Sequence, residues 1–306
     1  MITHISNISF LGPKMSRKKK IHFGPAGKPR NFKGTMGEVP AELKRLKLDA
    51  LEIEQVRRIN ISKEAAEKIR EEAKKNKIIL SLHAPYAINF ASEKENVIED
   101  SKKRLLDALR LAHWLNARIV VFHPGYYGKR SPQEALKLLI EGLKSVYKNA
   151  KKEGLSPLIG PETMGKLSQL GSLDEIIEVV KEIPQSAPVI DFAHLFARTK
   201  GKIRERRDYE KILSLIEDEL GSKYLDGLHI HFSKMEYGDK GERKHLPFGQ
   251  KAGPPFLPLA ELLIDYGIEA TIISESPLLE EDAIVMQRIV NGVKRKSKRE
   301  TLLKLE

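Results

Sequence analysis

Histidine and acidic side chains stand at the ends of short apolar runs in this 306-residue chain. His83 ends the run Ile-Ile-Leu-Ser-Leu-His, His123 ends Ile-Val-Val-Phe-His, and Asp191 ends Pro-Val-Ile-Asp. Further candidate ligands of the same types are Glu162, His194, His229, His231, His245 and Glu275. Carboxylates and imidazoles that gather at one place need a strong cation to offset their repulsion and desolvation. A fold that brings these runs together would therefore create a metal centre.

The residue types restrict the metal and its chemistry. Cysteine is absent, which removes thiolate ligands, thiol nucleophiles and disulfides. Nitrogen and oxygen ligands without sulfur suit zinc, manganese or iron. The set holds more ligands than one ion needs, so we expect two or three ions per chain, either zinc or manganese. Two metal ions about 4 Å apart can activate a hydroxide and stabilise a leaving oxygen, which favours phosphoryl-transfer chemistry.

Alternating strand and helix patterns predict how these residues are positioned. Apolar or β-branched runs predict strands near 21–23, 50–53, 78–82, 118–122, 157–160, 188–190, 227–231 and 270–274. Amphipathic stretches predict helices over 63–76, 97–116, 132–153, 173–183, 207–219, 257–266 and 280–293. Eight strands alternating with helices predict a single-domain α/β fold, the (β/α)8 or TIM barrel. Its active site lies at the C-terminal ends of the strands, where the candidate ligands stand.

Charge distinguishes the two ends of the chain from its middle. The net charge is +12, yet residues 1–37 carry eight Lys or Arg and no acid, and residues 294–306 carry six against two Glu. The rest of the chain holds 40 basic and 40 acidic groups. We therefore divide the whole chain into a basic N-terminal extension (1–19), a catalytic barrel (20–293) and a basic C-terminal tail (294–306). The ends either bind nucleic-acid phosphates or are solvated tails.

Other patterns limit which classes of protein this chain can belong to. No run of 18 apolar residues occurs, so we expect no membrane span. The segment before Lys18 lacks a secretory pattern, and Met15 is a further candidate start, so we expect a cytoplasmic protein. The polar stretch 232–256 predicts a long loop after the seventh strand, and such loops are usually functional.

The order of the candidate ligands resembles that of the endonuclease IV family of apurinic/apyrimidinic endonucleases. It reads His83…His123…Glu162…Asp191-x-x-His194…His229…His245…Glu275, within roughly residues 20–290. The resemblance implies a TIM barrel with three zinc ions. It assigns the first zinc to His83, His123 and Glu162, and makes Glu162 a bridge to the second. Asp191, His229 and Glu275 would complete the second site, with His194 and His245 at the third.

Flanking residues extend the resemblance to DNA binding. The stretch His83-Ala-Pro-Tyr86-Ala-Ile-Asn89 is similar to the family's His-x-x-Tyr-x-x-Asn, whose Tyr belongs to a DNA-penetrating loop. This implies that Tyr86 and Asn89 contact DNA. The family also inserts an Arg into the DNA stack after the second strand, which implies the same role for Arg57, with Arg58 as an equal candidate.

Two departures from the family pattern indicate a diverged branch. The family's Asp-x-His at the third zinc is replaced by Arg243-Lys244-His245, which lacks the Asp. His231 is a candidate replacement, because residues i and i+2 of a strand face the same side. Further candidates on the following loop are Glu236, Asp239 and Glu242. The stretch His229-Ile-His-Phe-Ser-Lys also replaces the family's His-x-Asn-Asp.

The resemblance implies a DNA-repair hydrolase of base excision repair. Such an endonuclease cleaves the phosphodiester 5′ to an abasic site in DNA, and Glu162 would bridge metals and position the nucleophile. One alternative is a sugar isomerase or epimerase, which needs one metal and could use Glu162, Asp191, His229 and Glu275 alone. A second alternative is a DNA-binding protein on a degenerate barrel. The surplus of histidines and the basic ends favour the nuclease.

Overall fold

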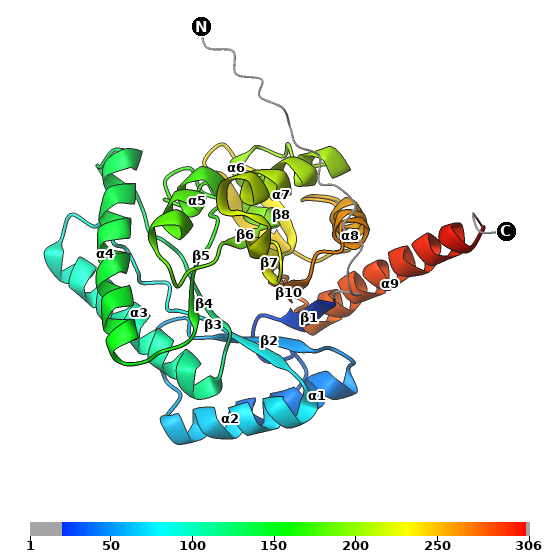
Figure 1. The fold of residues 1–306 in the computed structure, drawn as a ribbon, viewed down its shortest axis with the longest axis horizontal. Coiled ribbons are helices and arrows are strands. Elements are labelled where there is room, and N and C mark those ends of the chain that lie inside the picture. The colour runs from blue at the N-terminus through cyan, green and yellow to red at the C-terminus, as the bar shows by residue number, and fades with distance from the viewer. Residues whose placement is uncertain (1–19, 304–306) are drawn as a thin grey trace, which may run out of the picture.

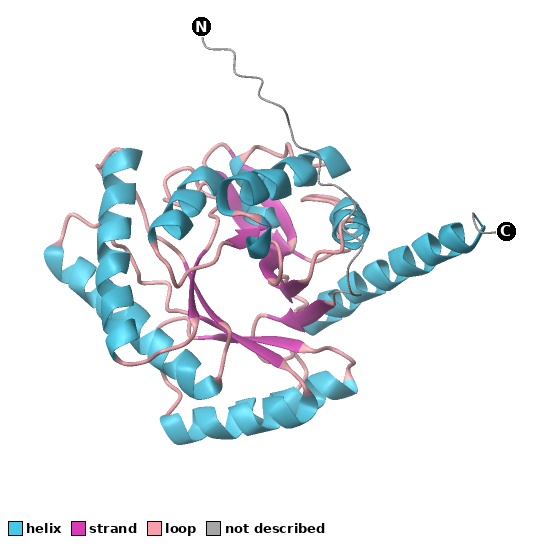
Figure 2. Cartoon of the chain, in the orientation of Figure 1, coloured by secondary structure: helices cyan, strands magenta, loops and turns pink. Residues whose placement is uncertain are grey.

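Eight parallel strands form a closed ring with the helices outside it (Figures 1 and 2), in a computed structural model that describes residues 20–303. The ring strands are β1 (Ile21–Pro25), β2 (Ala50–Glu54), β3 (Ile79–His83), β4 (Ile119–Phe122), β5 (Leu158–Pro161), β6 (Val189–Asp191), β7 (Leu228–Phe232) and β10 (Ala270–Ser274). They pair as β2-β3-β4-β5 and β6-β7-β10-β1. Bridges from Ala26 to Glu52 and from Glu162 to Val189 join the two sheets. The predicted (β/α)8 barrel is confirmed.

The helices follow the strands in turn. They are α1 (Val39–Arg45), α2 (Lys63–Asn76), α3 (Glu95–Leu115), α4 (Pro132–Lys152), α5 (Leu173–Glu182), α6 (Phe192–Arg198), α7 (Arg206–Leu220), α8 (Phe256–Asp265) and α9 (Glu280–Leu303), with short 3-10 turns at Met36–Glu38 and Ser222–Tyr224. Ser62, Ser131 and Ser172 cap α2, α4 and α5 by accepting a hydrogen bond from a first-turn amide. These caps fix where three of the predicted helices begin.

Helix α9 continues past the predicted start of the C-terminal tail. It runs unbroken to Leu303 and projects away from the barrel (Figure 1). Residues 294–303 are therefore helical, as a continuation of α9. The predicted N-terminal extension, 1–19, lies outside the described residues. None of the helices that the structure describes is long and apolar enough to cross a membrane.

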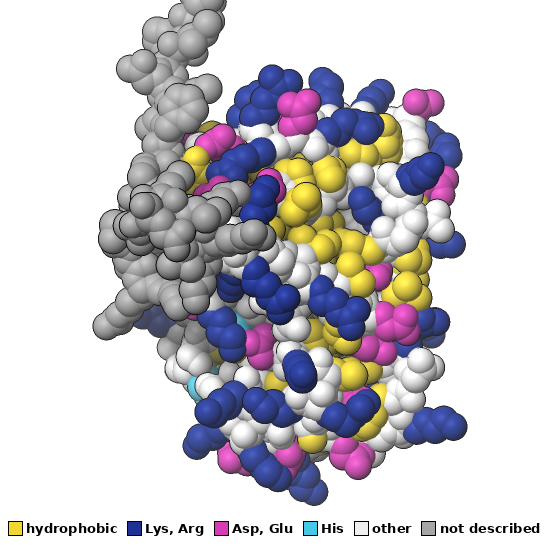
Figure 3. Space-filling view, turned by 90° about the vertical axis from the view of Figure 1, so that its right-hand side faces the viewer, with side chains coloured by type: hydrophobic (Ala, Val, Ile, Leu, Met, Phe, Trp, Pro, Cys, Tyr) yellow, Lys and Arg dark blue, Asp and Glu magenta, His cyan; other side chains and the backbone are white. Residues whose placement is uncertain are grey.

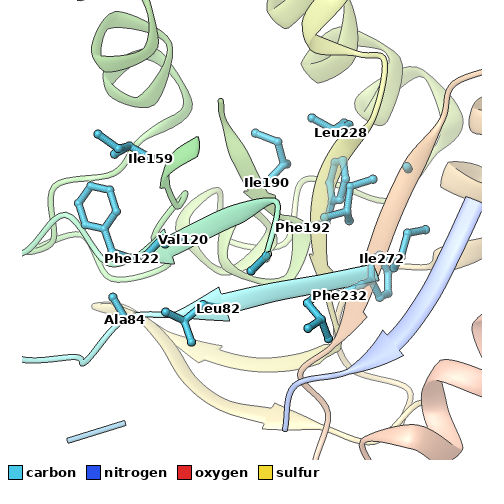
Figure 4. Packing of buried hydrophobic residues seen from close by; sticks show 14 of the residues in the cluster. Leu82, Ala84, Val120, Phe122, Ile159, Ile190, Phe192, Leu228, Phe232 and Ile272 are labelled. Carbon is cyan, nitrogen blue, oxygen red and sulfur yellow. The ribbon is translucent and has the colours of Figure 1, made fainter. Parts of the chain in front are cut away.

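The two faces of the ring strands bury different side chains. Outward-facing residues such as Leu82, Phe122 and Ile159 pack under the helices in one large apolar cluster (Figure 4). A separate small cluster of Ile119, Val121 and Val189 packs against half-buried Leu158 and Ala187. Residues two apart on a strand share a face, so His123 and Asp191 continue the inner rows of Val121 and Val189 toward the C-terminal rim. The apolar alternation thus positions the ionisable residues.

Gly24 lets the ring close between its first two strands. A Cβ atom at this position would collide with the carbonyl group of Ala50 on β2. Gly24 is therefore required for packing, because only glycine permits this close approach of two backbones.

The stretch 232–256 is more ordered than the predicted loop. It contains an antiparallel hairpin of β8 (Lys234–Gly238) and β9 (Gly241–Leu246), in which Met235 pairs with His245. The hairpin is tied to the loop after β5, because Glu242 accepts a hydrogen bond from the Gly165 amide at 3.1 Å. Its many charged residues hide the strand pattern, so the sequence predicted only a long polar loop here and missed the hairpin.

Charge is dispersed over the face of the molecule that Figure 3 shows. On the face shown in Figure 3, Lys and Arg side chains are spread among acidic and apolar ones and form no continuous band. This distribution agrees with the balanced charge of the middle of the chain.

Candidate metal centre

The ring strands bring the candidate ligands together in five overlapping groups. The first group is His83, His123 and Glu162; the second is Glu162, Asp191, His231 and Glu275; the third is His194, His245 and Glu275. Two further groups include acids of strand β2: Glu52 with His229 and His231, and Glu52 with Glu54 and Glu275. Within each group the ligand atoms lie within 4.8 Å of one another. Because neighbouring groups share Glu162 or Glu275, the first three form one continuous centre.

Glu162 lies at the middle of this centre and is fully buried. Its Oε2 atom is 3.4 Å from Nε2 of His83 and 3.2 Å from Nε2 of His123. Its Oε1 atom is 3.2 Å from Nδ1 of His231. The two carboxylate oxygens thus face two different groups, which is the arrangement that a bridging carboxylate requires.

His231, and not His229, belongs to the second group. Strand register explains the difference: β6 pairs Asp191 with His231 and Val189 with His229, so His231 lies level with the acidic ligand. Both imidazoles face the barrel interior, but His229 lies one step further from the rim. The resemblance placed His229 with the second zinc, and the structure instead pairs His229 with Glu52, at 2.9 Å.

Helix α6 positions Asp191 and His194 together. Asp191 is the N-cap of this helix, and its Oδ1 accepts a hydrogen bond from the His194 amide at 2.8 Å. The other oxygen, Oδ2, is buried and has no hydrogen-bond partner among the described residues. The spacing Asp-x-x-His is therefore one helical turn that sends a carboxylate oxygen and an imidazole to the same side.

The hairpin supplies an acid near the third group. Glu242 Oε2 lies 3.2 Å from Nε2 of His194. Glu242 is thus placed where it can substitute for the Asp that is missing before His245. Glu236, another predicted candidate, is exposed and faces Arg243 at 3.8 Å. His231, proposed from sequence as the replacement, lies in the second group.

The spacing of these atoms fits divalent cations. Two tetrahedral ligands at about 2.05 Å from one zinc ion are about 3.3 Å apart. Five imidazole–carboxylate pairs are separated by 3.1 to 3.4 Å: His83 and His123 with Glu162, His194 with Glu242, and His231 with Glu162 and Glu275. His83 Nε2, Glu162 Oε2 and Asp191 Oδ2 are buried without hydrogen-bond partners among the described residues. Such orphaned atoms are costly, and bound cations would satisfy them.

Contacts behind the ligands orient three of the imidazoles. His83 Nδ1 lies 2.8 Å from the Ala84 carbonyl oxygen, and His194 Nδ1 lies 2.9 Å from that of Thr163. His245 Nδ1 lies 2.8 Å from the Ser233 hydroxyl. A backbone carbonyl accepts the Nδ1–H of His83 and His194, which leaves Nε2 free as a ligand.

The charges of the metal-free centre depend on each other. Burial raises the pKa of Asp191 well above its usual value. Burial also acts against an ionised Glu162, but the positive charges of His231 and His123 outweigh it and hold that pKa well below its usual value. Burial lowers the pKa of His83, yet Glu54 and Glu162 raise it to about 10. Without metal, protonated imidazoles therefore balance the buried acids.

Sequence reasoning missed two acids of strand β2. Glu52 is fully buried, and Glu54 lies within ligand distance of Glu52 and Glu275. Burial and the charges of Glu52 and Glu275 raise the pKa of Glu54 to about 7. The signal was present in Ala-Leu-Glu-Ile-Glu, where acids alternate with apolar residues and so share the inner face.

The predicted DNA-contacting residues lie in different settings. Tyr86 is 47% exposed and its ring stacks on His123, with centroids 5.0 Å apart. Arg57 and Arg58 are exposed in the loop after β2. The Asn89 side chain accepts hydrogen bonds from the amides of Ala91 and Tyr126, at 3.1 Å and 3.3 Å. Asn89 therefore joins the loops after β3 and β4.

Basic residues of the first loop also lie at the C-terminal end of the barrel. Lys28, Arg30 and Lys33 are exposed after β1. Lys28 donates to the Gly34 carbonyl at 3.3 Å, and Arg30 faces Glu281 at 3.7 Å. By contrast, His22 pairs with Asp49 at 3.0 Å, and His113 lies 3.3 Å from the Ser156 hydroxyl, so both are outside the centre.

Two relatives by sequence match different shares of this chain. An uncharacterized protein of Methanocaldococcus jannaschii is 33% identical over 277 residues, which are 90% of this chain and 99% of that protein. A probable endonuclease 4 of Aquifex aeolicus is 28% identical over 187 residues, 60% of this chain and 65% of that protein.

Solved structures share the fold of this chain. Endonuclease IV from Thermus thermophilus has a TM-score of 0.66 at 20% identity, covering 90% of this chain and 99% of that one. A D-tagatose 3-epimerase-like protein has a TM-score of 0.66 at 22% identity, covering 87% and 97%. The family model described as xylose isomerase-like TIM barrel matches residues 40–289. The chain therefore belongs to the xylose isomerase-like TIM barrel family.

Proposed function

We propose that this protein is a metal-dependent phosphodiesterase that cleaves DNA 5′ to abasic sites. The observation that carries the proposal is the chain of three ligand groups joined through Glu162 and Glu275. One metal ion would use only one of these groups. A phosphodiester has one negative charge shared by two non-bridging oxygens and develops more on its leaving oxygen during cleavage, so it suits several ions in a row. The similarity to a probable endonuclease 4 supports the same reaction.

The protein's own residues would hold and align the reacting groups. Divalent cations, zinc or manganese, would supply charge neutralisation and lower the pKa of a water molecule. His83 and His123 would bind on one side of Glu162, and Asp191, His231 and Glu275 on the other. His194, His245 and Glu242 would hold the third ion. Burial of Glu162 keeps bulk water from competing for its oxygens.

Exposed side chains around the mouth would bind the DNA. Tyr86 offers an accessible ring beside His123, suited to stacking on an exposed base or sugar. Arg57, Lys28 and Lys33 are exposed cations on neighbouring loops and would pair with phosphates. An abasic sugar costs less to extrude than a paired base, which would favour the lesion.

A sugar epimerase is the second candidate. The second group alone, with Glu162, Asp191, His231 and Glu275, is a Glu–Asp–His–Glu set for a single ion. The epimerase-like fold neighbour is as similar in TM-score as endonuclease IV. His83, His123, His194 and His245 have no necessary place in that reaction. A metal content of one ion per chain would favour the epimerase.

A duplex with one abasic analogue tests the proposed activity. Purified metal-loaded protein should cut beside the analogue, leave a 3′-hydroxyl, and lose this activity in chelator. An undamaged duplex of the same sequence is the control. Absence of chelator-sensitive cutting by protein that contains two or three ions would contradict the proposal.

A further inference from the structure

The loop after β5, residues 164–171, lies against the hairpin that carries Glu242, and we name it the β5 loop. The Gly165 amide donates a hydrogen bond to Oε2 of Glu242 at 3.1 Å. The Leu167 amide donates to the Lys240 carbonyl oxygen at 3.2 Å, and the Glu242 amide donates to the Gly165 carbonyl oxygen at 3.4 Å. The position of Glu242, in both backbone and side chain, therefore depends on the β5 loop.

Two glycines let the β5 loop and the hairpin touch. A Cβ atom at Gly165 would collide with the Glu242 carboxylate, and a Cβ atom at Gly241 would collide with the Gly165 carbonyl oxygen. Only glycine permits such a close approach, so no side chain separates the two segments at this point. A shift of the β5 loop would therefore move Glu242 directly.

Arg198, the last residue of α6, holds the β5 loop in place. Its Nη1 donates hydrogen bonds to the carbonyl oxygens of Lys166 at 2.8 Å, Gln169 at 3.0 Å and Met164 at 3.4 Å. Its Nη2 donates to the Tyr127 hydroxyl at 3.0 Å, and the side chain is only 14% exposed. A guanidinium presents its donors in a fixed planar fork, so it can bind several acceptors at once. The β5 loop is thus folded around a largely buried cation.

Helix α6 contributes to the third group from both of its ends. His194 lies in its first turn, and Nε2 of His194 is 3.2 Å from Oε2 of Glu242. Arg198 follows four positions later, on the same side of the helix. One short helix therefore supplies an imidazole of the third group and, through the β5 loop, fixes the acid that faces this imidazole.

We propose that Arg198 is a positioning residue: it holds the β5 loop against the hairpin, which keeps Glu242 beside His194 and so sets the metal affinity of the third group. Loss of a residue that orients metal ligands typically costs about 10- to 100-fold in affinity. The inference rests on the third metal site of the proposed function and is independent of the substrate.

The first group provides the contrast within the same centre. His83 ends β3, His123 follows β4, and Glu162 is joined to Val189 by a bridge between β5 and β6. These positions are set by the ring strands and not by the β5 loop. A change at Arg198 should therefore weaken the ion of the third group and spare that of the first.

Metal titration and hydrogen exchange of the full chain test the role of Arg198. Metal-free wild type, Arg198→Met and Arg198→Lys are titrated with Zn²⁺ against a chromophoric chelator. Arg198→Met should weaken one bound equivalent about 10- to 100-fold and leave the others unchanged. In the metal-free protein it should also speed exchange of the Gly165 and Leu167 amides, because their bonds to the hairpin open more often. Arg198→Lys should lose less than about tenfold, since an ammonium still donates to carbonyl oxygens. It carries the test if Arg198→Met does not fold.

A double variant separates positioning from general stabilisation. Glu242→Gln alone should weaken the same equivalent, which identifies it as the ion of the third group. Arg198→Met combined with Glu242→Gln should bind this ion no more weakly than Glu242→Gln alone, because Arg198 acts through Glu242. Losses that add in the double variant would overturn the positioning role.

Arg130→Met is the matched control. Arg130 also donates to two backbone carbonyl oxygens, those of Ala91 at 3.0 Å and Ser92 at 3.2 Å, but in the loop after β3. We expect it to keep the wild-type affinity for the third ion. Wild-type affinity for every equivalent in folded Arg198→Met would overturn the inference, and so would a wild type that binds no third ion. A wild type that binds three ions without cutting abasic DNA would contradict the proposed function alone, and the titrations would still decide the role of Arg198.

Discussion

The outer and inner faces of the same barrel strands differ in what they bury. Leu82 and His83 are neighbours on β3, yet Leu82 packs in the apolar cluster under the helices and His83 belongs to the candidate metal centre. Both side chains are at most 1% exposed. Burial of Leu82 stabilises the fold, whereas burial of His83 leaves Nε2 without a hydrogen-bond partner in the described chain. The fold's stability and its chemistry thus lie on opposite faces.

The difference explains how such a costly centre persists. Several buried acids and imidazoles lie at the rim, and each would destabilise a folded protein if unpaired. The continuous apolar layer outside the strands supplies the stability that the inner face lacks. We therefore expect changes on the inner face to alter metal binding and activity more than stability, and changes on the outer face to do the reverse.

Glu162→Gln should give the largest effect. The amide keeps the size of the side chain but loses the negative charge that two ligand groups share, so cleavage should fall on the order of 10³-fold or more. Cleavage of the abasic duplex measures the loss of activity, and thermal unfolding measures any loss of stability. Glu236→Gln, an exposed hairpin residue outside the three groups, is the control. Near-normal activity of Glu162→Gln would contradict its bridging role.

Leu82→Ala should test the outer face. Removing this buried side chain leaves a cavity and should lower the free energy of unfolding by about 2 to 5 kcal/mol. The number of bound metal ions should not change. Urea unfolding together with metal analysis checks both statements. His83→Ala, the next residue, should show the opposite pattern, with weaker metal binding and a smaller effect on the metal-free fold. If the two variants changed the free energy of unfolding and the metal binding to the same extent, the proposed difference between the two faces would be wrong.

Metal binding should depend on pH. The pKa of His83, which burial lowers and the charges of Glu54 and Glu162 raise to about 10, means that the metal-free ring is protonated at neutral pH. A bound cation must displace that proton, so affinity should rise with pH, about tenfold per unit for each proton released. Calorimetry of Zn²⁺ binding in buffers of different ionisation enthalpy counts the protons. A heat independent of buffer would contradict this.

Asp49→Asn should give the smallest effect. Burial raises the pKa of Asp49, but hydrogen bonds from His22, Lys20 and the Phe23 amide outweigh it and leave the pKa below its ordinary 3.8. A depressed pKa stabilises the fold above the ordinary value, and this contribution is lost as pH falls below it. The variant should therefore lose about 1 kcal/mol at pH 7, and the loss should shrink as pH falls through the lowered pKa of Asp49. Chemical unfolding at a series of pH values measures this.

The sequence predicted most of the barrel because strands and helices leave local patterns. The predicted helix over 63–76 has the bounds of α2, and the predicted strand over 270–274 those of β10. The short helices α1 and α6 were missed because one or two turns leave little periodicity. The β8–β9 hairpin was missed because charged residues mask its alternation. Both errors fall in segments whose conformation depends on contacts with the rest of the barrel.

The identity of the ligand types was available in the sequence, but their grouping was not. Strand ends carrying His, Asp or Glu are a one-dimensional signal, and the fold rule places them at one rim. The choice of His231 over His229 depends on the register between β6 and β7, and the approach of Glu242 to His194 depends on the hairpin. Both arrangements, the position of His231 and that of Glu242, depend on contacts between segments that lie far apart in the sequence.

The sequence by itself determined the closed barrel, the rim at which ionisable groups gather, and a set of nitrogen and oxygen groups of the kinds that bind metal ions. These follow from composition and from periodicity, which act over a few residues. Only the tertiary structure decided that Glu52 meets His231, 179 positions further along the chain, and that the two oxygens of Glu162 face different groups. Such contacts depend on strand register and ring closure, to about an ångström, and no local pattern encodes them.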